Sequence, residues 1–195
     1  MNDWSTENIA LPASKAIHTE MASVLASAFY SDTTMISLLG QGHWQQIIKP
    51  YFLLQTGHAS TAITVRNQQG LMGGLLAKSP GQSMSTWQAV SHAFRTRRLI
   101  GDQYSNTQKF AHAIGAKVPS SPHWYINQIG IKPAYQSKGV GRHLLASLLT
   151  VCGTDPVYVD CEKSVADFYI SNGFSVVAAL EPSGMTVLGI NESFT

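Results

Sequence analysis

A glycine-bearing turn joins two strongly patterned segments in the second half of this 195-residue chain. The segment from Trp124 to Ile131 has the composition of a β-strand, and Pro133 closes it. After the turn, apolar side chains recur at the spacing of a helix face, at Val140, Leu144, Leu145, Leu148 and Leu149. The sequence therefore predicts a strand, a turn and a helix over residues 124–149.

The turn itself reads Gln136-Ser137-Lys138-Gly139-Val140-Gly141. Glycine lets the backbone approach a ligand closely, and the N-terminus of a helix presents unpaired N–H groups at the positive end of its dipole. This arrangement predicts an anion site that suits a diphosphate. Lys138 and Arg142 either add charge to that site or are solvated cations at a helix end.

Two better-known glycine loops do not fit this turn. A Walker A loop requires Gly-Lys followed by Ser or Thr, whereas Gly141 is followed by Arg142 and His143. The dinucleotide-binding fingerprint requires a third glycine at the position of Leu144. A nucleotide hydrolase and a Rossmann enzyme are both excluded.

The other segments alternate between helical and strand patterns. Helices are predicted over about residues 18–29, 44–48, 86–98, 102–114 and 163–171, and strands over about 60–67, 71–77, 157–160, 174–178 and 185–190. Pro50 is expected to interrupt or kink the second helix. The pattern indicates an α+β fold, with a single domain over residues 1–195.

The amino-acid composition limits the classes of partner that we expect for this protein. Charged residues make up 12% of the chain and the net charge is +2, with the densest cations at Arg95, Arg97 and Arg98, so a nucleic-acid partner is not expected. No apolar run approaches the roughly 18 residues of a membrane span, and Cys152 and Cys161 are too few for a disulfide framework. We expect a cytoplasmic protein with free thiols and no membrane partner. The seven histidines lack ligand spacing, so no metal is expected.

The turn and a second motif together resemble one family. Gln136-x-x-Gly139-x-Gly141 after the strand is similar to the coenzyme-A-binding motif of the GNAT superfamily of N-acetyltransferases. Phe168-Tyr169-x-x-x-Gly173-Phe174 resembles their later motif. The hairpin over residues 60–77 and the first helix resemble, more loosely, the subgroup that includes puromycin acetyltransferase.

The resemblance implies a central mixed, mostly antiparallel sheet, flanked by helices and splayed between its fourth and fifth strands, here 124–131 and 157–160. The cofactor-binding core then spans about residues 123–178 and the acceptor-side elements about 18–115. The pantetheine arm of the cofactor would bond to the backbone at Ile129 and Ile131. Gly130 between them marks either a close backbone approach or a mere packing gap.

Acetyl-coenzyme A is the implied acyl donor, with no metal. Glu162 stands where many relatives have Asn near the coenzyme A arm, and Ser164 is a possible substitute for that contact. The resemblance implies cofactor contacts at Ile129, Gly130, Ile131, Gln136, Ser137, Lys138, Gly139, Val140, Gly141, Arg142, Ser164 and Phe168.

In such enzymes the amine attacks the thioester directly, in a ternary complex. Tyr169 stands where the family has its general acid, although an aromatic residue on a helix also serves the core. The base is expected to be Asp160 or Glu162 acting through water, with Gln128 able only to hold a water. These two carboxylates are not ranked by the sequence.

The acceptor is expected to be a primary amine of a small molecule or a peptide. Five aromatic residues either form the wall of an acceptor pocket or belong to the core, and the sequence favours neither role. They are Trp44, Tyr51, Phe52, Trp87 and Tyr104. His123 either lines that pocket or is an exposed strand-end histidine. Dimers are common in the superfamily, so a homodimer is a further option. Two other classes stay open: a non-catalytic acyl-coenzyme A sensor, and a hydrolase based on Cys161.

Overall fold

The computed structural model describes residues 4–10, 14–57, 59–181 and 183–191. Within these residues one seven-stranded sheet has the order β1-β2-β3-β4-β5-β7-β6. Its strands are β1 (Ser5–Ala10), β2 (Thr61–Asn67), β3 (Gly70–Lys78), β4 (Trp124–Ile131), β5 (Val157–Glu162), β6 (Ser175–Leu180) and β7 (Met185–Ile190). All neighbouring strands are antiparallel except β4 and β5, which confirms the predicted mixed, mostly antiparallel sheet.

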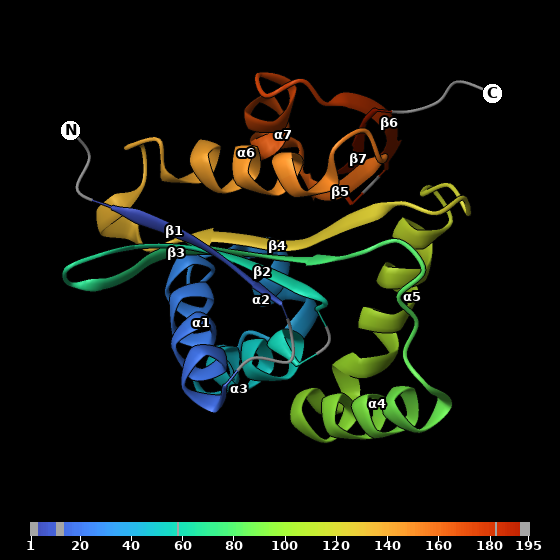
Figure 1. Cartoon of the computed structure of the whole chain (residues 1–195). Coiled ribbons are helices and arrows are strands. Elements are labelled where there is room, and N and C mark those ends of the chain that lie inside the picture. The colour runs from blue at the N-terminus through green and yellow to red at the C-terminus, as the bar shows by residue number, and fades with distance from the viewer. Residues whose placement is uncertain (1–3, 11–13, 58, 182, 192–195) are drawn as a thin grey trace.

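Helices cover both faces of the sheet (Figure 1). They are α1 (Lys15–Ala28), α2 (Thr33–Leu39), α3 (Trp44–Thr56), α4 (Thr86–Ile100), α5 (Tyr104–Gly115), α6 (Val140–Cys152) and α7 (Lys163–Ile170). In Figure 1, α6 and α7 lie above the sheet, and α1 and α3 lie below it. The helix α5 covers the far end of the lower face, where Ile114 packs with Met185 and Val187.

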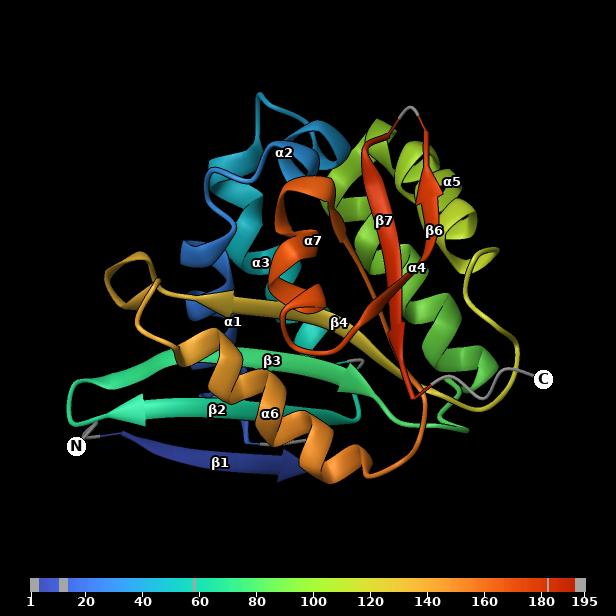
Figure 2. The ribbon, with the colours of Figure 1, turned by 90° about the horizontal axis from the view of Figure 1, so that it is seen from above.

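The sheet splits between β4 and β5. These two strands pair only where Trp124, Tyr125 and Ile126 face Val157, Tyr158 and Val159. Beyond Ile126, β4 stays paired with β3 as far as Ile131, and β5 stays paired with β7 as far as Glu162. The two strands therefore part from each other along this length. Figure 2 shows from above that β7, the strand next to β5, runs in a clearly different direction from β4. The splay that the family resemblance implied is therefore present.

Two apolar layers hold α6 and α1 against the sheet. The face of α6 predicted from its periodicity is buried, and Leu144, Leu145 and Leu148 pack against β2, β3 and β4. On the opposite face Met21 and Leu25 of α1 pack with Leu76 of β3. Burial of such side chains is the main force that fixes a helix on a sheet.

Two elements and one helix end differ from the sequence prediction. The strand β1 was not predicted because its side chains are mostly exposed and polar, and it forms by pairing with β2. The helix α2 is only seven residues long and starts with a cap, in which Asp32 accepts a hydrogen bond of 2.7 Å from the N–H of Met35.

Pro50 does not interrupt α3, because buried Ile48 and Phe52 hold the helix on both sides of it.

None of the helices in the described part of the chain combines the length and the apolar character needed to cross a bilayer.

Candidate active site

The turn between β4 and α6 has a backbone shape that exposes N–H groups. Ser137 has a φ of 59° and Gly139 a φ of 84°, and both values lie in the left-handed region. Gly139 is the N-cap of α6, and no side chain caps this helix. The N–H groups of the first turn of a helix have no partner within the helix. They are therefore available to an anion.

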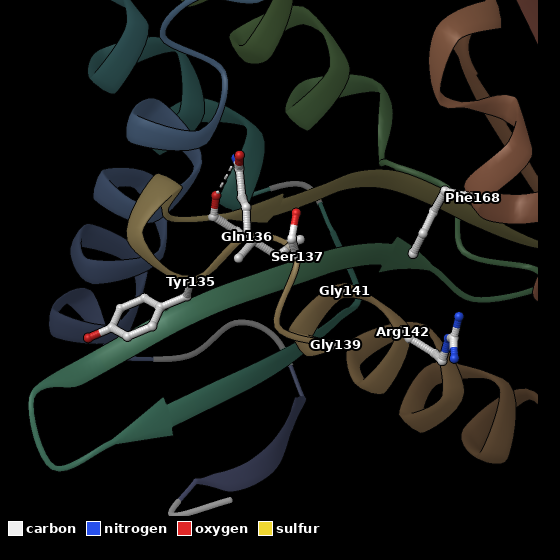
Figure 3. A pocket seen from close by; sticks show the side chains of 8 residues that line it. Tyr135, Gln136, Ser137, Gly139, Gly141, Arg142 and Phe168 are labelled. Carbon is white, nitrogen blue, oxygen red and sulfur yellow. Dashed lines mark hydrogen bonds between the residues drawn. The ribbon is translucent and has the colours of Figure 1, made fainter.

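The turn that carries these N–H groups lines a cavity of about 520 Å³. Figure 3 shows the side chains around it. It is lined by Ile131, Tyr135, Gln136, Ser137, Gly139, Gly141, Arg142 and Phe168. All of these except Tyr135 were predicted as cofactor contacts, and the structure brings them together. The site combines a helix N-terminus with a guanidinium, which is the chemistry that binds a diphosphate.

Lys138 and Val140, which were also predicted as cofactor contacts, do not line this cavity. The ammonium of Lys138 donates a hydrogen bond of 2.9 Å to the carbonyl of Ala134 and lies 5.6 Å from the centre of the Tyr135 ring. It therefore turns back on the preceding segment and away from the cavity. The side chain of Val140 is buried in the core under α6, so only its backbone can serve a ligand.

Gln136 ties the turn to the free edge of β4. Its Nε2 donates a hydrogen bond of 3.1 Å to the carbonyl of Ile131, marked by the dashed line in Figure 3. The N–H of Lys132 bonds to Met72 on the β3 side. Because neighbouring residues of a strand direct their backbone groups to opposite edges, Ile131 and Ile129 direct theirs toward the splay. This is the orientation expected for backbone contacts with an extended ligand.

Gly130 has a packing role that the sequence left open. A Cβ atom at this position would lie 2.9 Å from Cδ2 of Leu25 and 3.0 Å from Cβ of Ala28. The close backbone approach at Gly130 is thus made by α1, on the face of the sheet opposite α6. Glycine is required here because α1 packs directly on β4.

A second cavity of about 1100 Å³ adjoins the first. It lies on the α1 and α5 side of the splay, and both cavities are lined in part by Ile131 and Gln136. The predicted catalytic residues Tyr169, Asp160 and Glu162 all line it, together with Gln128 and His123. The turn and the candidate catalytic groups therefore lie in two cavities that share Ile131 and Gln136 in their walls.

Asp160 is the more deeply placed carboxylate. It accepts a hydrogen bond from the hydroxyl of Tyr125. Burial raises the pKa of Asp160 above its ordinary value, and the Tyr125 hydrogen bond offsets part of that rise. The result is a carboxylate that holds a proton more strongly than an exposed aspartate does. No role for Tyr125 was predicted from the sequence. Its side chain lies on the face of β4 opposite to that of the buried Trp124, because side chains alternate along a strand.

Glu162 has structural partners. It accepts hydrogen bonds from the hydroxyl of Thr34 and from the N–H of Thr34, the latter at 3.2 Å. The hydroxyl of Ser164 donates to its other oxygen at 3.3 Å. Glu162 thus connects the start of α2 to the start of α7. Ser164 is exposed and does not line either cavity, so the structure does not support its predicted cofactor contact.

Tyr169 serves the core and the cavity together. It is 3% exposed, and its ring packs edge-on against Phe168 and Phe174 with centroids 5.0 and 5.6 Å away. Burial raises the pKa of Tyr169, and nearby Cys161 and Asp160 raise it further. The phenol is therefore protonated at neutral pH and able to donate.

The structure separates the five aromatic residues that the sequence left open between an acceptor pocket and the core. Of the five aromatic residues named from the sequence, only Tyr51 lines the cavity. Trp44 and Phe52 are buried in the core, and Trp87 is 79% exposed on α4. Tyr104 packs against the α1 and α3 side of the core instead. Aromatic side chains in the cavity wall come from Phe29, Tyr51, Phe110, His123, Tyr125 and Tyr169.

Cys161 lines the cavity as a protonated thiol. Burial raises its pKa to about 12, and the nearby carboxylates of Asp160 and Glu162 contribute. A thiol needs to ionise to act as a nucleophile, so the raised pKa of Cys161 does not favour the hydrolase. Among the described residues no group of His, Cys, Asp and Glu side chains is arranged to hold a metal ion.

Comparisons with solved structures find the same fold in proteins of low sequence identity. A Corynebacterium glutamicum protein described as histone acetyltransferase HPA2 and related acetyltransferase matches with a TM-score of 0.73 at 19% identity, over 98% of both chains. Arylalkylamine N-acetyltransferase 2 from Aedes aegypti matches with a TM-score of 0.66 at 13% identity, over 96% of this chain and 98% of that one.

The PaiA N-acetyltransferase from Thermoplasma acidophilum, solved in complex with coenzyme A, matches with a TM-score of 0.56 at 12% identity, over 95% of this chain and 98% of that one. A search of curated proteins finds no significant sequence match. The model of the Acetyltransferase (GNAT) family matches residues 75–174, just over half of the chain, including the turn and the Tyr169 helix. The chain belongs to the GNAT family of acetyltransferases.

Proposed function

We propose that this protein transfers an acetyl group from acetyl-coenzyme A to a primary amine, by direct attack of the amine in a ternary complex. The observation that carries the proposal is that Ile131 and Gln136 line both cavities. A donor held by its diphosphate at the α6 turn can extend along β4 and present its thioester beside Tyr169 and Asp160.

The donor site is assigned to the turn and the free edge of β4. The N–H groups at the start of α6 and the guanidinium of Arg142 bind the diphosphate. The backbone of Ile129 and Ile131 pairs with the amide groups of the pantetheine arm, as an added strand would. Phe168 lines the cavity and supplies apolar contact beside the diphosphate.

Acetyl-coenzyme A supplies an activated thioester carbonyl. We assign Asp160 as the base that takes a proton from the acceptor ammonium, directly or through a water, because its raised pKa brings its basicity closer to that of an amine. The amine nitrogen then bonds to the carbonyl carbon and the C–S bond breaks. Tyr169 donates its phenolic proton to the departing sulfur, and the second proton lost by the bonded nitrogen returns through water to the Tyr169 phenolate, so the products are a neutral amide and the coenzyme A thiol. Glu162 supports the cavity wall.

Primary amines are favoured as acceptors by two structural neighbours. One is named arylalkylamine N-acetyltransferase 2 and another agmatine N-acetyltransferase. Both names refer to a primary amine, and the cavity of this protein has carboxylates and aromatic rings that suit an ammonium group. A non-catalytic acyl-coenzyme A sensor is the competing function, because the same donor site serves both.

Two measurements separate these functions. Acetyl-coenzyme A should raise the melting temperature of the protein, and absence of any shift would contradict donor binding. Release of free thiol from acetyl-coenzyme A should then require an added amine from a panel of aliphatic and arylalkyl amines. Thiol release without an amine indicates a hydrolase, and donor binding without thiol release across the panel indicates a sensor.

A further inference from the structure

Lys78 is a charged side chain in the acceptor cavity that the proposed chemistry does not use. It is the last residue of β3, it is partly buried, and it lines the same cavity as Asp160 and Tyr169. Among the residues that the structure describes, its ammonium has no hydrogen-bond or ion-pair partner. An ammonium that has lost part of its water and has no counter-ion favours an anion as its neighbour.

The position of Lys78 relates it directly to the base. In the β3–β4 register Lys78 lies opposite Tyr125, whose hydroxyl donates to Asp160. Strands in a sheet are about 4.8 Å apart, and Asp160 lies two residues further along β5 than Tyr158, the partner of Tyr125. The backbones of Lys78 on β3 and Asp160 on β5 are therefore at least about 12 Å apart. The cavity therefore has a cationic end at Lys78 and an anionic end at Asp160.

The other charged groups of the cavity already have partners. Asp32 accepts from the N–H of Met35, Asp160 from Tyr125, and Glu162 from Thr34. Burial lowers the pKa of Lys78, and the pKa of His92 on α4 is lowered by its own burial and by the charge of Lys78. Of the charged side chains lining the cavity, Lys78 alone lacks a partner within the described residues.

We infer that Lys78 binds a carboxylate carried by the acceptor, at the end remote from the amine that is acetylated. Ser79 and Gln82, which follow Lys78 and line the same cavity, offer further polar contacts to that carboxylate. The acceptor class is then an aminocarboxylate, rather than a polyamine or an arylalkylamine without a carboxylate. This inference rests on the proposed transfer to an amine and specifies its substrate class.

The test compares matched amines that differ only in this charge. A series of ω-amino carboxylates of increasing chain length is assayed beside the corresponding ω-amino carboxamides, with thiol release as the readout. For at least one chain length the wild-type protein should prefer the carboxylate by about tenfold or more in kcat/KM, the gain of one charge-assisted hydrogen bond. Lys78→Gln should abolish the preference, and Lys78→Arg should keep part of it.

Lys117→Gln is the matched control. Lys117 is exposed and does not line the cavity, but it lies only two residues after Gly115, which does. Its loss removes the same charge near the rim, so it reports general attraction of anions. The carboxylate preference should survive in Lys117→Gln. Equal use of carboxylate and carboxamide by the wild type, or an unchanged preference in Lys78→Gln, would overturn the inference while leaving amine acetylation intact.

A binding measurement covers acceptors that turn over too slowly to assay. With coenzyme A present, the ω-acetamido carboxylates that would be the products should raise the melting temperature of the wild-type protein, and less so that of Lys78→Gln. No shift with any of these compounds refutes the carboxylate site. A missing shift with acetyl-coenzyme A itself would instead count against the proposed function.

Discussion

The hydroxyl of Tyr125 on β4 donates a hydrogen bond to Oδ1 of Asp160 on β5. Tyr125 pairs with Tyr158 near the end of the short parallel ladder, and Asp160 lies two residues further along β5. The bond therefore bridges the two strands at the point where they begin to part. It holds the carboxylate at the mouth of the splay and lowers its pKa relative to burial alone.

Tyr125→Phe should shift the pH dependence of acetyl transfer. The lost hydrogen bond had stabilised ionised Asp160, so the pKa of Asp160 should rise further and the acidic limb of kcat/KM should move to higher pH. A profile over roughly pH 5–9 measures this shift. Tyr30→Phe, at an exposed tyrosine outside both cavities, is the control. A shift to lower pH would contradict Asp160 as the base.

The two carboxylates should respond differently to neutralisation. Asp160→Asn should lower kcat by about a hundredfold or more, the typical loss of a general base. Glu162→Gln retains an acceptor oxygen for Thr34, so its main effect should be a lower melting temperature. Measurement of kcat and melting temperature for both variants checks this. A large loss of kcat in Glu162→Gln beside an active Asp160→Asn would reverse the assignment.

Tyr169→Phe should lower turnover by at least about tenfold, because the leaving thiolate loses its proton donor. The ring packing against Phe168 and Phe174 is retained, so the affinity for acetyl-coenzyme A and the melting temperature should change little. Steady-state kinetics and calorimetric titration with the donor separate these effects. Unchanged turnover would remove Tyr169 from the mechanism and leave it a core residue.

Arg142→Ala should weaken acetyl-coenzyme A binding by about tenfold through loss of a charge-assisted contact. The neighbouring Lys138→Ala removes the same charge, but Lys138 bonds to the Ala134 carbonyl and does not line the cavity. Its effect on affinity should therefore be small. Titration of both variants at one salt concentration makes the comparison, and equal losses would show that general charge, rather than the position of Arg142, governs binding.

Gly130→Ala should destabilise the protein by about 1–3 kcal/mol, because the new methyl group would lie too close to Leu25 and Ala28. Gly42→Ala, where nothing lies within 4 Å of the added carbon, is the control and should change stability little. Urea unfolding gives both values. Restoration of stability by Ala28→Gly in the Gly130→Ala background would identify the contact with α1 as the cause.

Local patterns in the sequence predict most of the fold. The bounds of β4 and β7 match the prediction, because their composition and flanking turns are local signals. The turn from Gln136 to Gly141 was recognised for the same reason. The strand β1 was not predicted, because it forms by pairing with β2 and its sequence has no alternation of apolar and polar residues.

The details of the site depend on contacts that are distant in sequence. Whether Lys138 or Arg142 faces the cavity is decided by the Ala134 carbonyl and the Tyr135 ring. The role of Gly130 is decided by Leu25 and Ala28, which belong to a different helix. The spacing of residues along the sequence does not indicate which side chains from different elements will be in contact. Such contacts arise only when the helices and strands are packed together.

The parting of β4 and β5 gives this sheet an exposed edge in its middle. Free strand edges usually lie at the rim of a sheet, where they invite pairing with other chains and aggregation. Here the unpaired length of β4 after Ile126 faces a hollow between helices of both layers. The hydrogen-bonding capacity of an edge strand therefore lies inside the molecule, between two layers of helices, instead of at the rim.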